Sequence, residues 1–211
     1  MTPTELTDYA RQRYNAVGDA HFADGEMRRY IWQAQMELAK ESLCIRSVYT
    51  TSTVASQQEY SFPTSTISIK RITIAGNKIE PRSLEEVLDL SSSVASPTGA
   101  SYIYAIWNEV LYLAPIPDAV YALKIFSVNE PQEVTTTSIL EVPSRYHLDL
   151  AEFINEQMTL KDKNYQGAAL YTVKWKEAKR AAKVFERKML RGQQLSFVKD
   201  ADRMIDMWGS M

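Results

Sequence analysis

The sequence is poor in the residues that usually carry chemistry. It has one cysteine, Cys44, and two histidines, His21 and His147, which excludes a disulfide framework and a zinc site built from several thiolates. Its seven glycines are scattered, and the motifs G-x-S-x-G and H-E-x-x-H are missing. No run of about 18 apolar residues occurs, and no apolar stretch follows the N-terminus, so we expect neither a membrane span nor a secretory signal. We expect no enzymatic activity, no cofactor and no metal site.

The overall charge is nearly balanced but unevenly placed. The 24 basic and 26 acidic residues give a net charge of −2, which excludes a globally basic nucleic-acid-binding protein. Hydrophobic residues make up 45% of the chain, as in globular proteins. Residues 1–45 carry −2, residues 46–143 carry −4 and residues 144–211 carry +4. The hydrophobic periodicity changes near the same boundaries.

The first 45 residues predict two helices. Thr2, Pro3 and Glu5 form the pattern of a capping box with proline at the first helical position, and residues 15–18 end that helix. Asp24 is the expected N-cap of the second helix. An apolar stripe at helical spacing then comprises Met27, Ile31, Ala34 and Leu38.

Residues 46–141 change to the alternation typical of strands. Strands are expected over residues 48–54, 59–62, 67–74, 102–107, 110–113 and 120–128. A change of phase at Lys70-Arg71 predicts a β-bulge, and Gly76-Asn77 and Asn108-Glu109 predict hairpin turns. Ser83 and Glu86 form a second capping box, which opens one short helix. This segment is predicted to be a small antiparallel β-sandwich or barrel.

Residues 142–191 return to helical periodicity. One helix starts near Ser144, and the polar residues 161–164 form a turn before a longer helix that Gly192 is expected to end. The apolar stripe of the longer helix is Tyr165, Ala168, Thr172, Trp175, Ala178, Ala182, Phe185 and Met189. The predicted fold is therefore α+β: an antiparallel bundle of about four helices from residues 1–45 and 142–191, an inserted β-module at 46–141, and an extended C-terminal tail at 192–211.

The last long helix carries most of the positive charge. Residues 161–191 contain ten lysines and arginines and only three acids, a net charge of +7. The candidate basic surface comprises Lys174, Lys176, Lys179, Arg180, Lys183, Arg187, Lys188 and Arg191. One interpretation is a surface for a polyanion or an acidic protein, and the other is a solvated helix face.

The tail at residues 192–211 is too apolar for a purely solvating segment and too short to fold alone. One interpretation is that it packs on its own bundle. The other is that it orders against a partner, with Trp208 as the anchor and Phe197 as its support. The candidate residues for binding this partner are Leu195, Phe197, Met204, Ile205 and Trp208.

Five side chains are candidates for catalysis, and we interpret two of them, His21 and His147, as ordinary surface or partly buried groups. Cys44 follows an apolar stripe and is interpreted as a small buried hydrophobe rather than a nucleophile paired with His147. Glu152 and Glu156 stand four residues apart on one helix face, as a carboxylate pair could. We interpret them as a solvated acidic face.

Three stretches carry a resemblance to a known family. They are residues 67–87 (ISIKRITIAGNKIEPRSLEEV), residues 106–118 (IWNEVLYLAPIPD) and residues 142–150 (VPSRYHLDL). Residues 160–171 (LKDKNYQGAALY) are similar to the family's turn between two helices. The sequence resembles the head-to-tail adaptor proteins of short-tailed bacteriophages, which assemble on the portal.

The resemblance implies a structural virion protein of the neck or tail region, made in the host cytoplasm. It implies a homo-oligomer, a dodecameric ring, that binds the portal protein and a tail or nozzle protein. DNA would pass through the ring without sequence-specific binding, and no membrane is involved. The alternatives are a nucleic-acid-binding module that uses the basic helix at 161–191, or another connector such as a head-closure or tail-completion protein.

Overall fold

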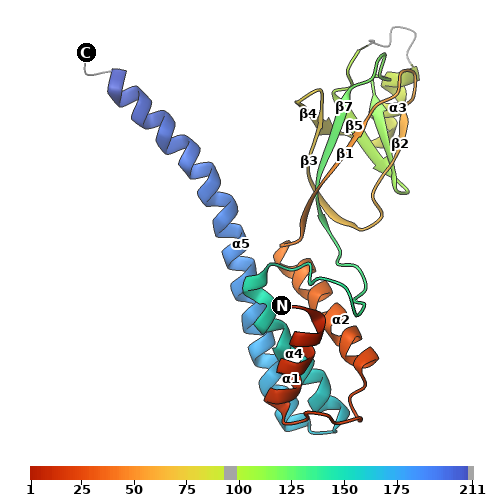
Figure 1. Ribbon diagram of the computed structural model, residues 1–211. Helices are drawn as coiled ribbons and strands as arrows, with labels where there is room; N and C mark the ends of the chain where they lie inside the picture. The colour runs from red at the N-terminus through yellow and green to blue at the C-terminus, as the bar shows by residue number, and fades with distance from the viewer. Residues whose placement is uncertain (93–98, 209–211) are drawn as a thin grey trace. The chain divides into compact units, whose positions relative to one another are not determined.

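The computed structural model describes residues 1–92 and 99–208, and the side chains of residues 1–92 and 99–189. The described residues form an α+β structure with five α-helices and seven strands (Figure 1). The chain divides into two compact units. The helical unit contains residues 1–45 and the chain from Pro131 onward, and the sheet unit contains Arg46–Glu130.

Residues 131–141, which the sequence analysis placed with the strands, belong to the helical unit. They run along α2 (Asp24–Ser42) and are held there by two of its side chains. Trp32 donates its indole N–H to the Pro131 carbonyl at 3.2 Å, and the Gln35 amide oxygen accepts from the Glu141 N–H at 2.8 Å. Trp32 and Gln35 thus satisfy a backbone group at each end of this segment, which strand periodicity could not reveal.

The two N-terminal helices form largely as predicted. α1 (Pro3–Tyr14) has the complete capping box between Thr2 and Glu5, and Asn15 ends it in a left-handed conformation. α2 begins at Asp24 with Ala23 as its N-cap, one residue before the cap expected from the sequence. Its predicted apolar stripe is buried, which confirms that this face points into the core.

The C-terminal helices pack against the N-terminal ones. A 3₁₀ turn (Ser144–Tyr146) leads into α4 (His147–Lys161), and α5 (Tyr165–Trp208) follows after a short turn. α4 contacts α1, α2 and α5, and α5 also contacts α2. Asn164 caps α5 by accepting from the Gly167 N–H at 3.0 Å.

The expected end of α5 at Gly192 is wrong, because the helix continues to Trp208. A glycine inside a helix costs only about 1 kcal/mol, and the glutamines and leucine that follow it favour the helix. The apolar stripe of α5 is also only partly correct. Ala168, Trp175 and Ala182 are buried, but Phe185 and Met189 are exposed at 42% and 46%.

The sheet unit is one curled sheet, not the wholly antiparallel sandwich or barrel that was predicted (Figure 1). Its strands are β1 (Arg46–Ser52), β2 (Glu59–Ser61), β3 (Thr66–Ile74), β4 (Asn77–Pro81), β5 (Ile103–Trp107), β6 (Val110–Ala114) and β7 (Ala122–Asn129). They are ordered β1-β7-β3-β4-β5-β6-β2. The β4–β5 pair is parallel, because α3 (Leu84–Ser92) lies on the crossover between these strands.

Local signals placed the turns of the sheet correctly or within one residue. The register of β3 against β7 shifts between Ile69 and Arg71, which confirms the bulge. Asn108 and Glu109 form the β5–β6 turn with positive φ angles, as does the Ala75-Gly76 pair between β3 and β4. The main core of the unit comprises Tyr60, Ile72, Ile74, Ile79, Tyr104, Leu111, Leu113, Leu123 and Ile125.

Candidate functional site

The basic segment of α5 divides into paired and unpaired cations. Five of its members lie on the surface: Lys174, Lys176, Arg180, Arg187 and Lys188. Lys179 and Lys183 instead form ion pairs with carboxylates of α2. The side chain of Arg191 lies outside the described residues. The candidate basic surface is therefore smaller than the sequence suggested.

The paired lysines hold α5 against α2. Lys179 Nζ lies 2.7 Å from Glu37 Oε2, and the same oxygen accepts from the Trp175 indole N–H at 2.9 Å. Lys183 pairs with Glu41, and the hydrogen bond from Lys183 lowers the pKa of that carboxyl. These two cations have a structural role, which the spacing of charges along α5 alone could not show.

A buried carboxylate lies one turn further along α5. Glu186 is 2% exposed, and its Oε1 accepts from the Tyr146 hydroxyl at 2.8 Å and from the Arg145 guanidinium. The Arg145 guanidinium also lies over the Phe185 ring, with its carbon 4.8 Å from the ring centroid. This group joins α5 to the start of α4. Local sequence patterns do not reveal this group, because Glu186 lies about forty residues from Arg145 and Tyr146 in the chain.

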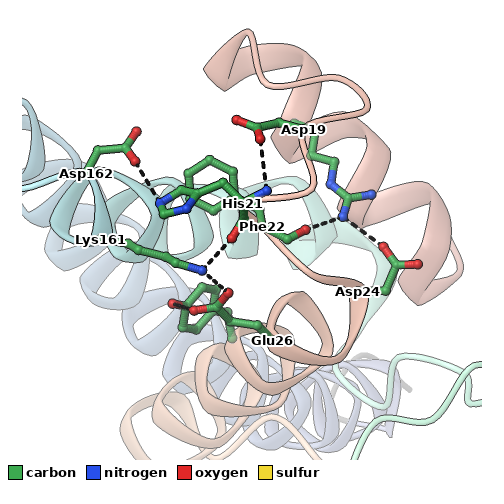
Figure 2. A network of polar contacts seen from close by, with 9 residues as sticks. Asp19, His21, Phe22, Asp24, Glu26, Lys161 and Asp162 are labelled. Carbon is green, nitrogen blue, oxygen red and sulfur yellow. Dashed lines mark hydrogen bonds and ion pairs between the residues drawn. The ribbon is translucent and has the colours of Figure 1, made fainter.

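Two cations hold the loop between α1 and α2 (Figure 2). Arg11 Nη2 donates to the Phe22 carbonyl at 2.5 Å and to Asp24 Oδ1 at 2.8 Å. Lys161, from α4, donates to the His21 carbonyl at 2.5 Å and pairs with Glu26. The hydrogen bond from Lys161 lowers the pKa of Glu26.

The residues weighed for catalysis are dispersed. Cys44 is buried, and desolvation raises the pKa of its thiol, which disfavours the reactive thiolate. His147 is buried, with Nε2 2.9 Å from the Val142 carbonyl oxygen. His21 lies in the α1–α2 loop, 3.3 Å from Asp162.

The predicted solvated face of Glu152 and Glu156 is wrong for Glu152. The Glu152 side chain is only 15% exposed and pairs with Arg13 of α1 at 2.7 Å. Glu156 accepts from the Thr172 hydroxyl of α5 at 2.6 Å. Both carboxylates therefore face neighbouring helices, because α4 lies between α1 and α5 and has little free surface.

In the described part of the chain, no group of three or more His, Cys, Asp or Glu side chains is arranged to hold a metal ion. No helix of that part is long and apolar enough to cross a membrane. Among the residues whose side chains the structure describes, the helical unit offers instead an exposed surface of α5 with five cations that form no ion pair there.

The comparison with protein families decides the classification. The family model described as SU10 adaptor protein matches residues 1–196, which include all of both units up to the last part of α5. The chain belongs to the SU10 adaptor protein family. No curated protein matches the sequence. Membership confirms the resemblance to phage head-to-tail adaptors and supports a structural role in the phage particle rather than an enzymatic one.

In this SU10 adaptor, the proposed docking residues of the tail lie at the end of α5. The backbone of residues 192–208 is helical, so the expected extended tail is instead a continuation of α5. The side chains of Leu195, Phe197, Met204, Ile205 and Trp208 lie outside the described residues. Their role in docking stays a prediction.

Proposed function

We propose that the protein is a structural virion component that assembles as a ring on the portal and links it to the tail. The ring has twelve subunits, as the resemblance to phage adaptors implies. It leaves a channel through which DNA passes without sequence-specific contacts. The observation that carries this proposal is the adaptor family match over residues 1–196. Exposed cations on α5 support it, since an assembly component needs free surface for its neighbours.

We propose further that the helical unit is an antiparallel bundle in which residues 192–208 of α5 form the arm that docks on the portal or on a neighbouring subunit. Trp208 and Phe197 would be its anchors, because buried aromatic side chains dominate most interfaces. The inserted sheet unit then faces another component of the neck, such as the tail or nozzle protein.

The decisive experiment mixes the purified protein with the portal of the same phage and images the product by negative-stain electron microscopy. A ring of density added at one end of the portal is expected. Truncation after Arg191 should abolish that density and leave the melting temperature of the free protein nearly unchanged. Unchanged portal binding by the truncated protein would remove the arm from the proposal.

The second candidate function is nucleic-acid binding by the basic helix, favoured by five surface cations on the described part of α5. A duplex bound through several phosphates loses affinity steeply as salt rises. Measuring the affinity for a DNA duplex at about 50 and 200 mM salt tests this reading. Micromolar binding that falls by on the order of 1,000-fold would favour it over a ring that only surrounds DNA.

A further inference from the structure

A ridge of five exposed residues runs along α5: Val173, Lys176, Arg180, Val184 and Arg187, called here the α5 ridge. Their spacing of three or four residues places them on one side of the helix. The two valines are 55% and 51% exposed. Within the part of the chain that the structure describes, the three cations form no ion pair, unlike the lysines that face α2. The ridge thus combines exposed apolar side chains with cations that have no carboxylate partner in that part of the chain.

The sheet unit carries a surface of opposite charge and similar build on α3. Residues 84–92 contain three acids and no base. Val87 is fully buried against the sheet, and Glu85, Leu88 and Asp89 lie on the outer side of the helix. Leu88 is 41% exposed between the two carboxylates. We call these three residues the α3 face.

The two surfaces carry opposite charges, and both have the same arrangement of apolar and charged side chains. Each has an exposed aliphatic centre with charged side chains on its flanks, as at a protein interface with an apolar core and a polar rim. Like charges prevent two ridges, or two α3 faces, from pairing with each other. A contact between these two different surfaces is heterologous, and such contacts generate rings when the rotation closes.

We propose that the α3 face of one copy docks on the α5 ridge of a neighbouring copy. Leu88 packs against Val184, and the carboxylates of Glu85 and Asp89 pair with Arg180 and Arg187. These two arginines lie about 10 Å apart along α5, on either side of Val184, so their long side chains can reach both carboxylates. The inference rests on the proposed ring and names the surfaces that join its subunits.

One such contact joins the five residues of the ridge to the three of the α3 face, fewer than the roughly 20–30 residues a side of a standard stable interface. Assembly therefore depends on several weak contacts that form together, which the portal would favour by concentrating the subunits. The test accordingly measures association both with and without the portal.

The test uses two charge-reversed variants of the full chain. The ridge variant is K176E/R180E/R187E, and the face variant is E85K/D89K. Each alone should self-associate at least about a hundredfold more weakly than the natural sequence, because like charges now oppose each other. An equimolar mixture should recover assembly, since the unchanged face of one variant meets the unchanged ridge of the other, and the two reversed surfaces also match.

Sedimentation velocity measures the assembly, and circular dichroism checks that each variant is folded. The control K70E/K78E/K124E makes the same change in net charge as the ridge variant, at exposed lysines of β3, β4 and β7. It should assemble like the natural sequence.

A mixture that stays unassembled while the control assembles would overturn the proposal. So would a natural sequence that does not associate with itself, with or without the portal. The proposed function is judged separately, by portal binding of the natural sequence. If that sequence binds the portal and the mixture fails, the adaptor function stands and the subunit contact is wrong.

Discussion

The two units of the molecule are stabilised by different interactions. In the helical unit, ion pairs and charged hydrogen bonds join segments that are far apart in the sequence, as Arg13–Glu152, Lys161–Glu26 and Lys179–Glu37 show. In the sheet unit, aliphatic side chains form the main core, and the Arg82–Glu80 ion pair, at 3.5 Å, is exposed to solvent. Both units bury apolar side chains, Met27 and Leu150 among them in the helical unit. The comparison teaches that pH and salt should act mainly on the helices, whereas the sheet unit should respond mainly to loss of apolar volume.

The strongest test of this contrast removes the sheet unit. Replacing residues 46–130 by a short Gly/Ser linker should leave helices that melt cooperatively, because residues 1–45 and 131 onward form a compact unit of their own. Far-ultraviolet circular dichroism during thermal unfolding measures this. Loss of the helical signal at room temperature would mean that the units stabilise each other.

A cavity in the sheet core should have the next largest effect. Leu123 is fully buried in the main core, and Leu123→Ala should lower the free energy of unfolding of the sheet unit by about 2–5 kcal/mol. Denaturant unfolding at low and high salt measures it. Because the lost interaction is apolar, the loss should be the same at both; a strongly salt-dependent loss would contradict the contrast.

The buried carboxylate of α5 gives the matching test in the helical unit. Glu186→Gln keeps the shape of the side chain but removes the negative charge that accepts hydrogen bonds from Arg145 and Tyr146. The substitution should lower the free energy of unfolding by about 1–3 kcal/mol. Glu177→Gln, at an exposed position of the same helix, is the control and should change little. Equal stability of the two variants would show that the buried group contributes no more than surface charge.

The smallest expected effect is the pH dependence of two ion pairs that remain partly accessible to solvent, Glu26–Lys161 and Glu41–Lys183. Glu26 and Glu41 have lowered pKa values in the folded protein, so their contribution is present above the ordinary value of 4.5 and is lost as pH falls through the folded pKa. Burial raises the pKa of Asp149, which works in the opposite direction, because protonation at low pH relieves its desolvation. The net loss between pH 6 and pH 3 should be under about 1 kcal/mol for each pair.

Denaturant unfolding at the two pH values measures this loss. The double variant E26Q/E41Q should show a smaller difference in unfolding free energy between the two pH values, because the two glutamines do not titrate. If the double variant kept the full pH dependence, side chains other than Glu26 and Glu41 would be responsible for it.

The parts of the fold that sequence reasoning found were those set by short-range chemistry. The Thr2 capping box and the Asn108-Glu109 turn depend on neighbouring residues, so their patterns were sufficient. The parallel β4–β5 pair was not predicted, because it depends on where α3 crosses and not on alternation within either strand. Glu186 was not found because no hydrophobic pattern places a carboxylate in a core; its burial requires partners from another helix. The same long-range pairing made the basic surface of α5 smaller than the charge count suggested.

The loop between α1 and α2 has a consequence for protein engineering. Arg11 and Lys161 hold it through the carbonyl oxygens of Phe22 and His21, which every amino acid possesses (Figure 2). These two hydrogen bonds are thus independent of which side chains stand at positions 21 and 22. Before them, Val17, Gly18 and Ala20 are exposed, whereas Asp19 accepts from the His21 N–H at 2.9 Å and is kept. Foreign peptides could be grafted at these positions without disturbing the helices on either side. An assembly carrying many copies of the chain would then display the grafted peptide in a regular, multivalent array.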